Sequence, residues 1–440
     1  NEILYFASEI KALPNSQPNQ TSIDSYLKTG KYPENRETFF KDIFQILPGT
    51  INSFYKNKIT SKKFYSLIEN IKKYKNKKRS FEEYEYLIEQ SIRLRFRSDV
   101  PINIHFSGGV DSTALLIKIK ETLGWDYPIE AFCLAFDKNN HLDYNYAKKI
   151  CKLLNVKLNK VTLKSSEVPN LSKKLQYYED EPFGGIPSLA MYKLNRVEKK
   201  KGFIVSLEGQ GGDEGLGGYL SHIYLAIKDL FEVTPDSPLI KHLLRYIKTD
   251  LKTALSIAEK YIVSGFNAHQ DLTNIKPNIY NKKIKKNFGW LETAQINNVL
   301  ADKIPRTLRF HDRISSACSR ELRFPFLDHN VLAYGISFDI KEKYELGLPK
   351  SPLIKIINRY LPEELFSNIK RSDSSPQTQW LKNDLKIWAK KNISEVKKKI
   401  VVTKDLEQEI KSLFEKKNLD NSFPIWQLIN LNLMLNYKNK

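Results

Sequence analysis

The chain has 440 residues, is 41% hydrophobic and carries a formal net charge of +21, so it is long enough for a large core and two domains. It contains no apolar run of about 18 residues, which excludes a transmembrane helix, and its start shows no signal peptide. Cys133, Cys151 and Cys318 lie far apart, and the histidines form no HExxH pattern. We therefore expect a cytoplasmic protein in a reducing compartment, without a disulfide or zinc framework.

The positive charge raises the question of nucleic-acid binding. Most basic residues are lysines that are spread along the chain, whereas nucleic-acid sites favour clustered arginines interleaved with aromatic residues. We interpret the densest run, Lys72–Arg79, as a solvated linker. Composition bias is the preferred explanation of the charge, and no nucleic-acid partner is expected.

The first 66 residues contain short strand-like runs separated by turn signals. The runs are ILYFAS (3–8), FQILPGTINSFY (44–55) and KKFYSL (62–67). They predict a β-rich fragment. Because the chain opens on such a run without an initiator Met, we also expect that the N-terminal part of a longer protein is missing.

Helical and strand patterns alternate from residue 80 onward. Ser80–Phe96 has a serine at the N-cap position, followed by apolar residues at helical spacing. The strands expected after it are 102–106, 129–136, 156–163 and 203–209, and the helices between them are 112–124, 142–155 and 188–202. This rhythm predicts an α/β fold with a parallel sheet covered on both faces, followed beyond residue 220 by a helical C-terminal part.

The stretch INIHFSGGVDSTALL places Ser-Gly-Gly-Val-Asp-Ser between a strand and a helix. Backbone N–H groups and the positive end of the helix dipole make such a loop a phosphate site. Gly108 and Gly109 let the backbone approach phosphate oxygens, while Ser107 and Ser112 can donate hydroxyl hydrogen bonds. Asp111 would repel phosphate, so its expected partner is Mg²⁺. The alternative is an ordinary capped turn.

A second glycine-rich loop, SLEGQGGDEGLGGYL, follows the fourth expected strand. Asp213 and Glu214 stand there at a strand's carboxyl end, where open parallel sheets bind ligands. A carboxylate opposite Asp111 would complete a magnesium site for pyrophosphate. The alternative is a flexible capped loop, although ordering so many glycines without a ligand would be entropically costly.

These motifs resemble those of the asparagine synthetase family, whose synthetase domain is a PP-loop ATP pyrophosphatase. SGGVDS is not a Walker loop, because it lacks Gly-x-x-x-x-Gly-Lys-Ser/Thr. GQGGDEGLGGY, LRFHDRISSACSRELRFPFLDHNVL (308–332) and ELGLPKSPLIKIINRYLPEELFSNIKR (345–371) resemble further family motifs in the same order. The early LYFASEIKAL and ILPGT resemble the tail of the family's N-terminal glutaminase domain.

The resemblance implies three parts and a reaction. Residues 1–66 would be the C-terminal remnant of a class II (Ntn) glutaminase domain, 67–80 a Lys-rich linker, and 81–440 an amide ligase domain with a sheet of the PP-loop (adenine nucleotide α-hydrolase-like) type. A substrate carboxylate would attack the α-phosphate of ATP, giving an acyl-adenylate and pyrophosphate. Ammonia, normally taken from glutamine, would then give an amide and AMP. The default product is asparagine from aspartate.

The resemblance also implies the site residues, with ATP and Mg²⁺ as cofactors. The residues implied to bind ATP are His105, Phe106, Ser107, Gly108, Gly109, Asp111, Ser112, Leu134, Gly209, Gln210 and Gly211. Those implied to be catalytic are Lys350, Gln210, Asp213, Glu214, Glu321 and Arg323. Asp111 and Asp213 would hold Mg²⁺, and Lys350 would reach the α-phosphate. From the residues alone, Lys350 is one lysine among many. Glu321 and Arg323 are equally well explained as substrate contacts or as a buried structural ion pair.

Three departures from the family pattern bear on function. Asn1 stands where the glutaminase needs an N-terminal Cys, so the chain as given cannot hydrolyse glutamine by that route. Gln210 replaces the Glu of GEGSDE or GEGGDE, which is the family's candidate base for ammonia, and a neutral amide cannot take a proton. Gly184, Gly185 and Ile186 replace polar residues and an Arg that serve aspartate.

The acceptor therefore stays open between aspartate and another carboxylate, such as a sugar acid in polysaccharide biosynthesis. A PP-loop enzyme that modifies tRNA is a further option, supported only by the charge. A non-catalytic scaffold is disfavoured by the presence of Ser107, Asp111, Asp213 and Lys350. Expected partners are a small carboxylate and glutamine or ammonia, without nucleic acid or membrane, and with a homodimer left open.

Overall fold

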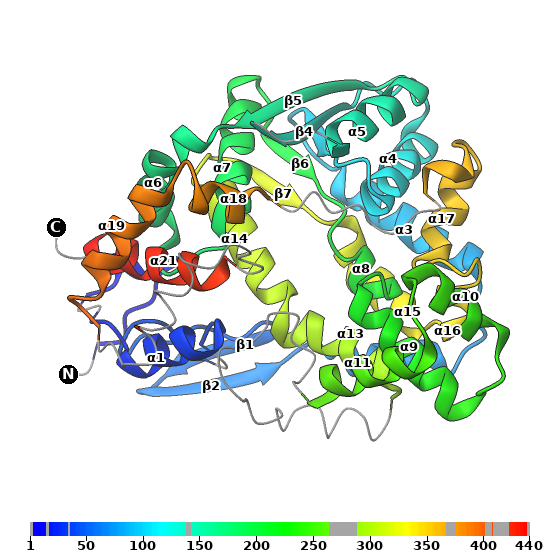
Figure 1. The fold of residues 1–440 in the computed structure, drawn as a ribbon, viewed down its shortest axis with the longest axis horizontal. Coiled ribbons are helices and arrows are strands. Elements are labelled where there is room, and N and C mark those ends of the chain that lie inside the picture. The colour runs from blue at the N-terminus through cyan, green and yellow to red at the C-terminus, as the bar shows by residue number, and fades with distance from the viewer. Residues whose placement is uncertain are drawn as a thin grey trace.

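A five-stranded parallel sheet lies at the centre of the computed structural model, which describes residues 3–14, 17–33, 36–137, 142–263, 288–366, 375–400, 407 and 422–437 (Figure 1). The strand order is β5–β4–β3–β6–β7, and every neighbouring pair is parallel. The strands are β3 (Ile102–His105), β4 (Glu130–Phe136), β5 (Lys157–Leu163), β6 (Val205–Leu207) and β7 (Glu321–Arg323). The α/β fold predicted from the sequence is confirmed.

The strand order reverses beside β3. The chain runs from β3 outward to β4 and β5, and then returns past β3 to β6. The carboxyl ends of β3 and β6 therefore flank a topological switch point, where open α/β sheets bind ligands. The two glycine-rich loops of the sequence follow these two strands, at residues 106–109 and 208–211.

Helices cover both faces of the sheet. Successive side chains of β4 point to opposite faces and pack against different helices. Ala131 and Cys133 pack into the core beneath α4 and α5, whereas Phe132 and Leu134 pack against α7. The first layer contains α3 (Phe81–Arg95), α4 (Val110–Leu123), α5 (Leu142–Leu153) and α17 (Ser351–Asn358). The second contains α6 (Val168–Glu179), α7 (Gly185–Lys200) and α14 (Ile304–Ser316).

The described chain after β6 is mostly helical, as expected, although the three-residue β7 was not expected. Its remaining helices are α8 (Gly212–Leu216), α9 (Leu220–Val233), α10 (Pro238–Ile247), α11 (Leu251–Val263), α13 (Trp290–Asn297), α15 (His329–Ser337), α16 (Ile340–Lys343), α18 (Gln377–Lys382), α19 (Lys386–Val396) and α21 (Phe423–Tyr437). Short 3₁₀ turns occupy Ile10–Ala12, Ser165–Glu167, Pro325–Leu327 and Glu363–Leu365, and a π-helical turn occupies Asn298–Asp302.

The N-terminal part differs from the sequence prediction. Residues 3–8 form no strand, and their large apolar side chains, including Phe6, are exposed. A hairpin of β1 (Thr50–Tyr55) and β2 (Lys58–Lys63) accounts for the other two strand-like runs only in part. Helix α1 (Gln20–Thr29) was not expected.

The Lys-rich segment Lys72–Arg79 begins as helix, which the sequence analysis did not expect, although Lys72, Lys73, Lys77 and Lys78 are exposed to solvent. Helix α2 (Leu67–Lys75) packs against α15 through its apolar face. The Nζ of Lys75 lies 2.6 Å from a carboxylate oxygen of Glu292. Basic residues on the outer face of this helix concealed its helical period.

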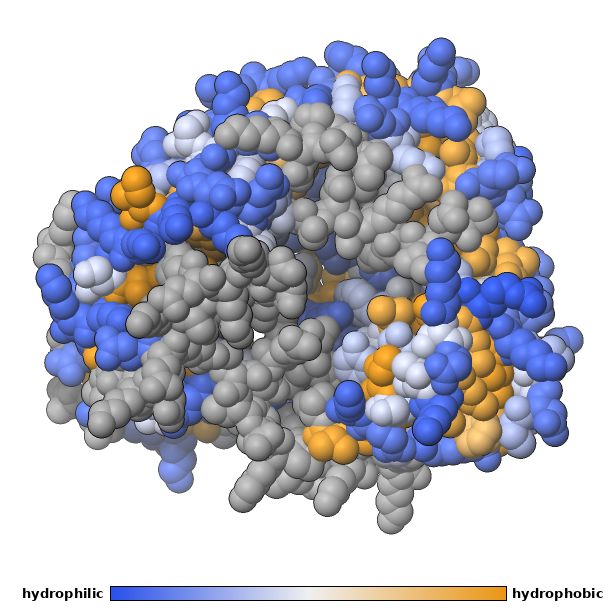
Figure 2. Space-filling view, in the orientation of Figure 1, coloured by the Kyte–Doolittle hydropathy of each residue, from blue (hydrophilic) through white to orange (hydrophobic). Residues whose placement is uncertain are grey.

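The surface reflects the Lys-rich composition. Hydrophilic residues cover much of the described surface in Figure 2, with separate hydrophobic patches between them. None of the described helices combines the length and the apolar character that crossing a membrane requires.

Candidate functional site

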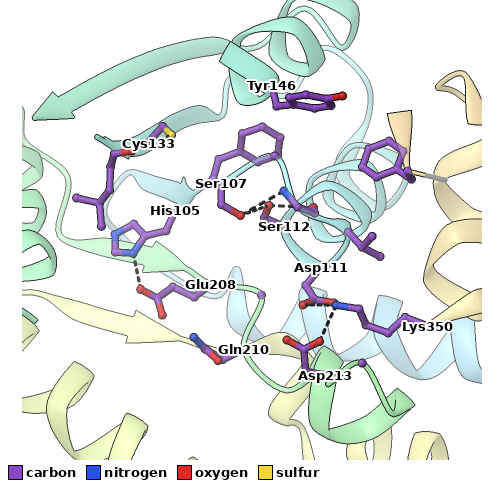
Figure 3. A pocket seen from close by; sticks show the side chains of 18 of the residues that line it. His105, Ser107, Asp111, Ser112, Cys133, Tyr146, Glu208, Gln210, Asp213 and Lys350 are labelled. Carbon is purple, nitrogen blue, oxygen red and sulfur yellow. Dashed lines mark hydrogen bonds and ion pairs between the residues drawn. The ribbon is translucent and has the colours of Figure 1, made fainter. Parts of the chain in front are cut away.

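Most of the expected ATP-binding residues converge on one cavity at the carboxyl ends of β3, β4 and β6 (Figure 3). Its volume is about 430 Å³. The expected residues that line it are His105, Phe106, Ser107, Gly108, Gly109, Asp111, Ser112, Leu134, Gly209, Gln210, Asp213 and Lys350. The expected residues outside its lining are Gly211, Glu214, Glu321 and Arg323.

The loop after β3 has the geometry of a phosphate cradle. Gly108 has a φ of +74°, and a Cβ there would lie 2.8 Å from the backbone nitrogen of Ala147, so only glycine fits. Helix α4 begins at Val110, directly after the loop, and its positive dipole end faces the cavity. The hydroxyl oxygens of Ser107 and Ser112 lie 3.2 Å apart at the same opening.

Lys350 joins the two glycine-rich loops. Its Nζ donates to Asp111 at 2.9 Å and to Asp213 at 2.8 Å, and the residue is only 4% exposed (Figure 3). Burial alone would lower the pKa of Lys350, but the two carboxylates outweigh it and raise the pKa above its usual range. This burial separates Lys350 from the solvated lysines of the chain.

The donor set around Lys350 fits Mg²⁺. Asp111 and Asp213 both contact the Lys350 ammonium, so the two carboxylates lie close together. Two hard oxygen donors suit Mg²⁺, which commonly binds one or two carboxylates and completes its shell with water and substrate phosphates. Among the described residues no cluster of three or more His, Cys, Asp or Glu could hold a metal ion.

Close backbone packing explains the glycines of the second loop. A Cβ on Gly209 would lie 3.1 Å from the backbone carbonyl carbon of Asp111. A Cβ on Gly212 would collide with the Asp111 carboxylate, and one on Gly218 with that of Asp213. The missing side chains therefore let the two acidic loops approach each other.

An apolar wall borders the phosphate cradle. It is formed by Phe132, Cys133, Leu134, Ala135, Phe136, Tyr144, Tyr146, Met191 and Leu194. Tyr146 lies beside the Ser107 loop in Figure 3. A flat apolar surface next to a phosphate site is suited to a nucleotide base.

The sequence analysis missed Glu208 and His311, which form a charged cluster with His105 in the same cavity. Glu208 lies between two imidazoles: it contacts the Nδ1 of His105, and its Oε2 lies 2.7 Å from the Nδ1 of His311. The Nε2 of His105 lies 3.0 Å from Glu198. Burial would lower the pKa of His105, but the carboxylates of Glu198 and Glu208 raise it to about 9.

One signal for this cluster was available in the sequence. Glu208 directly follows β6, so the rule that ligands bind at the carboxyl ends of strands points to it. His311 lies a hundred residues farther along, on α14, and only the three-dimensional fold brings it to Glu208.

The expected residues outside the cavity make other contacts. Glu214 is buried and accepts a hydrogen bond from the hydroxyl of Tyr219, while burial raises its pKa. Glu321 and Arg323 form an ion pair at 2.7 Å, and the Glu321 side chain is 56% exposed. The structure therefore places this pair at the surface.

Segment 184–186, where the sequence departs from the family pattern, lies at the start of α7. The N–H of Ile186 donates to Oε1 of Gln377 at 3.0 Å. None of the three residues lines the described cavity.

The sequence is similar to those of a known protein family. Residues 83–437 match the asparagine synthase family. The chain is 25% identical to "Asparagine synthetase [glutamine-hydrolyzing] 1" of Bacillus subtilis, over 98% of this chain and 71% of that protein. It is 26% identical to "Putative asparagine synthetase [glutamine-hydrolyzing] 2" of Methanocaldococcus jannaschii, over 51% of this chain and 44% of that protein.

Two more distant similarities complete the comparison. "Amidase chyE" of Penicillium rubens is 22% identical over 82% of this chain and 64% of its own length, so the chain spans only part of the relatives it matches. Among solved structures, NMN synthetase from Francisella tularensis aligns with a TM-score of 0.25 and 15% identity, over 55% of this chain and 96% of that one.

Proposed function

Because the chain belongs to the asparagine synthase family, we propose that it uses ATP to activate a carboxylate and then transfers ammonia to the acyl group. The observation that carries this proposal is the buried bridge of Lys350 between Asp111 and Asp213, directly beside the phosphate cradle. It combines positive charge with candidate metal ligands at the point where phosphate would bind.

In this proposal, each wall of the cavity contacts one part of ATP. The base lies on the apolar wall that contains Leu134 and Tyr146, and the pyrophosphate part lies in the loop of Ser107 and Ser112. Mg²⁺, held by Asp111 and Asp213, would neutralise charge on the departing pyrophosphate.

Lys350 stabilises the charge that develops on the α-phosphate when the carboxylate attacks. Its ammonium is already fixed by two carboxylates, so little reorganisation is needed during the reaction. A carboxylate oxygen bonds to the α-phosphorus while the bond from that phosphorus to the bridging oxygen breaks, so pyrophosphate leaves and an acyl-adenylate forms. Ammonia then displaces AMP to give the amide.

Aspartate is the default acceptor, with another carboxylate such as a sugar acid as the alternative. Among the described residues the cavity lining includes no arginine, and its cationic or potentially cationic groups are Lys350, His105 and His311. A zwitterionic acceptor needs partners for both of its charges, so the acceptor must be identified directly.

The test is amide formation with ammonium chloride, ATP and Mg²⁺, which needs no glutaminase. Aspartate and D-glucuronate are supplied in parallel, and the products are identified by mass spectrometry. Asparagine formed in equal amount to AMP supports the default acceptor. Formation of glucuronamide only would support the alternative, and no amide with ammonia and any carboxylate would contradict the proposal.

We also propose that residues 1–66 are the remnant of a glutaminase domain and that 81–440 form the ligase domain. The similarity to the Bacillus subtilis protein extends over 98% of this chain, and therefore beyond the family match that begins at residue 83.

A further inference from the structure

The replacement of Glu by Gln210 leaves the amidation step without its expected base. Ammonia that attacks an acyl carbon becomes a cationic nitrogen and must lose a proton, and a neutral amide cannot accept one. Glu208 lies two residues before Gln210 on the same loop, and both residues line the cavity (Figure 3). His311 lines the same cavity from α14.

The two histidines beside Glu208 are held differently. His105 contacts carboxylates through both ring nitrogens, Glu208 through Nδ1 and Glu198 through Nε2. His311 contacts Glu208 through Nδ1 alone, at 2.7 Å. The hydrogen bond of His311 to a described residue is made by Nδ1, and the ring lines the cavity.

The charge state of Glu208 fixes the tautomer of His311. Burial would raise the pKa of Glu208, but His311 and His105 outweigh it and hold the pKa far below its usual range. An ionised carboxylate only accepts hydrogen bonds, so the proton of a neutral His311 ring is on Nδ1. Its Nε2 then carries a lone pair, as in other histidines oriented by a carboxylate.

We propose that His311 is the proton acceptor of the amidation step and that Glu208 is its positioning residue. The inference rests on the proposed function. The nitrogen–carbon bond forms, the bond between the acyl carbon and the AMP oxygen breaks with its electron pair leaving on AMP, and the Nε2 of His311 takes one proton from nitrogen. The protonated ring then returns this proton to water.

The charges around His311 come from several elements. Glu208 and His105 face it from the ends of β6 and β3, and Glu198 lies behind them on α7. Arg320, which follows α14, is neutralised by Glu198. On α14 itself, Arg309 and Arg313 are paired with Glu181 and Asp180. A proton on His311 therefore stays beside one ionised carboxylate, and the neighbouring arginines are already paired.

His311→Asn tests the proposal, because the asparagine amide can still donate to Glu208 while the basic nitrogen is lost. Two steps are measured separately: carboxylate-dependent exchange of pyrophosphate into ATP, and amide formation with ammonium chloride. We expect pyrophosphate exchange to stay within about threefold and amide formation to fall about 10²- to 10³-fold, the range of a lost general base. The fall of the wild-type amidation rate at acid pH, where a basic nitrogen is protonated, should be absent in His311→Asn.

His329→Asn is the matched control, since His329 is 60% exposed on α15 and lies outside the cavity lining; both rates should stay unchanged. Equal losses of exchange and amidation in His311→Asn, or an unchanged amide rate, would overturn the inference. Exchange is tested with aspartate and then with D-glucuronate. If neither promotes exchange in the wild-type protein, aspartate and D-glucuronate are excluded as acceptors, and the tautomer of His311, measured without substrate, decides the inference.

A second measurement needs no substrate. Nitrogen-15 NMR of labelled histidines, assigned with His311→Asn, reports the tautomer of His311 in the wild-type protein. We expect the neutral ring to carry its proton on Nδ1. A neutral ring with the proton on Nε2 would overturn the inference whichever carboxylate is the substrate.

Discussion

Lys350 shows how the fold gives a common residue type an uncommon environment. The chain contains 71 lysines and arginines, and nothing in the residues around position 350 marks it as buried. Only the motif GLPKS suggested its role. Its backbone is left-handed, with a φ of +59°, which is uncommon for a residue other than glycine. The strained turn directs the side chain between two carboxylates.

Replacing this lysine should remove both charge balance and activity. In Lys350→Met, Asp111 and Asp213 face each other without a cation, so we expect the free energy of unfolding without Mg²⁺ to fall by about 3 kcal/mol. Carboxylate-dependent pyrophosphate exchange should fall at least about 10²-fold. Urea denaturation and exchange assays measure the two effects.

The control for this variant is Lys355→Met on α17, which begins directly after Lys350; its side chain is 32% exposed and pairs with Glu345. It should lose less than about 1 kcal/mol and no activity. Equal behaviour of the two variants would contradict the role given to Lys350.

His105 should make stability depend on pH. Its folded pKa of about 9 lies above the ordinary value near 6.5, so the stabilisation is complete below about pH 6.5 and is lost as pH rises through 9. The stability advantage of wild type over His105→Gln, measured by urea denaturation, should shrink by on the order of 2–3 kcal/mol between pH 7 and pH 10. A difference that stays constant would show that His105 is not charged at pH 7.

The position of a residue in the cavity could be predicted where neighbouring residues in the sequence form one local motif. Gly108 and Ser107 could be predicted because the strand, the loop and the helix adjoin in sequence. Glu208 and His311 could not be paired, because they are 103 residues apart and each resembles an ordinary polar residue. The contact between these two side chains exists only because tertiary packing buries them together, and the sequence does not show that packing.

At the scale of elements, the second glycine-rich loop depends on backbone proximity. Gly218 and Gly215 lie three residues apart with different surroundings: a Cβ on Gly218 would collide with Asp213 and approach Lys350 to 2.8 Å, whereas one on Gly215 would meet its nearest atom, on Leu332, at 3.6 Å. Gly218→Ala should therefore lose pyrophosphate exchange at least about tenfold, because it displaces the bridge.

Gly215→Ala is the matched control and should keep its exchange activity within about twofold, since its Cβ makes only an ordinary contact. If the two substitutions reduce exchange equally, close packing at Gly218 is not what positions Asp213. Circular dichroism of both variants checks that the fold is retained.

Helices and strands with a clear apolar period or a capping residue could be predicted from the sequence. Elements that form only by pairing with another segment could not. Ser80 caps α3 as expected, its hydroxyl accepting from the N–H of Glu83 at 3.1 Å. β7 has three residues and is a strand only because it pairs with β6. ILYFAS has the apolar residues of a strand, but no described strand pairs with it.

Helix α21 shows the same dependence on packing. Its residues are apolar on nearly every side, and Trp426 is fully buried in a core shared with α6 and α19. Trp426→Ala should lower the free energy of unfolding by about 3–5 kcal/mol, as measured by urea denaturation. Ile387→Ala, on a side chain that is 86% exposed, should lose less than about 0.5 kcal/mol.

At the scale of the whole molecule, one core joins the two ends of the chain. Tyr26 and Phe39, near the N-terminus, belong to the same buried cluster as Trp426 and Ile429 of α21. Nε2 of Gln427 donates to the carbonyl of Tyr26 at 2.6 Å, and Figure 1 shows α1 beneath α21. The N-terminal fragment is thus part of the same packed body as the sheet-bearing part.

The central claim is that this body cleaves ATP between its α and β phosphates. Phosphorus NMR of ATP turned over with Mg²⁺, ammonium chloride and the accepted carboxylate tests it most directly. The account predicts AMP and pyrophosphate in equal amounts, with neither formed in Lys350→Met. Formation of ADP and orthophosphate would contradict it, because that outcome means attack at the γ-phosphate.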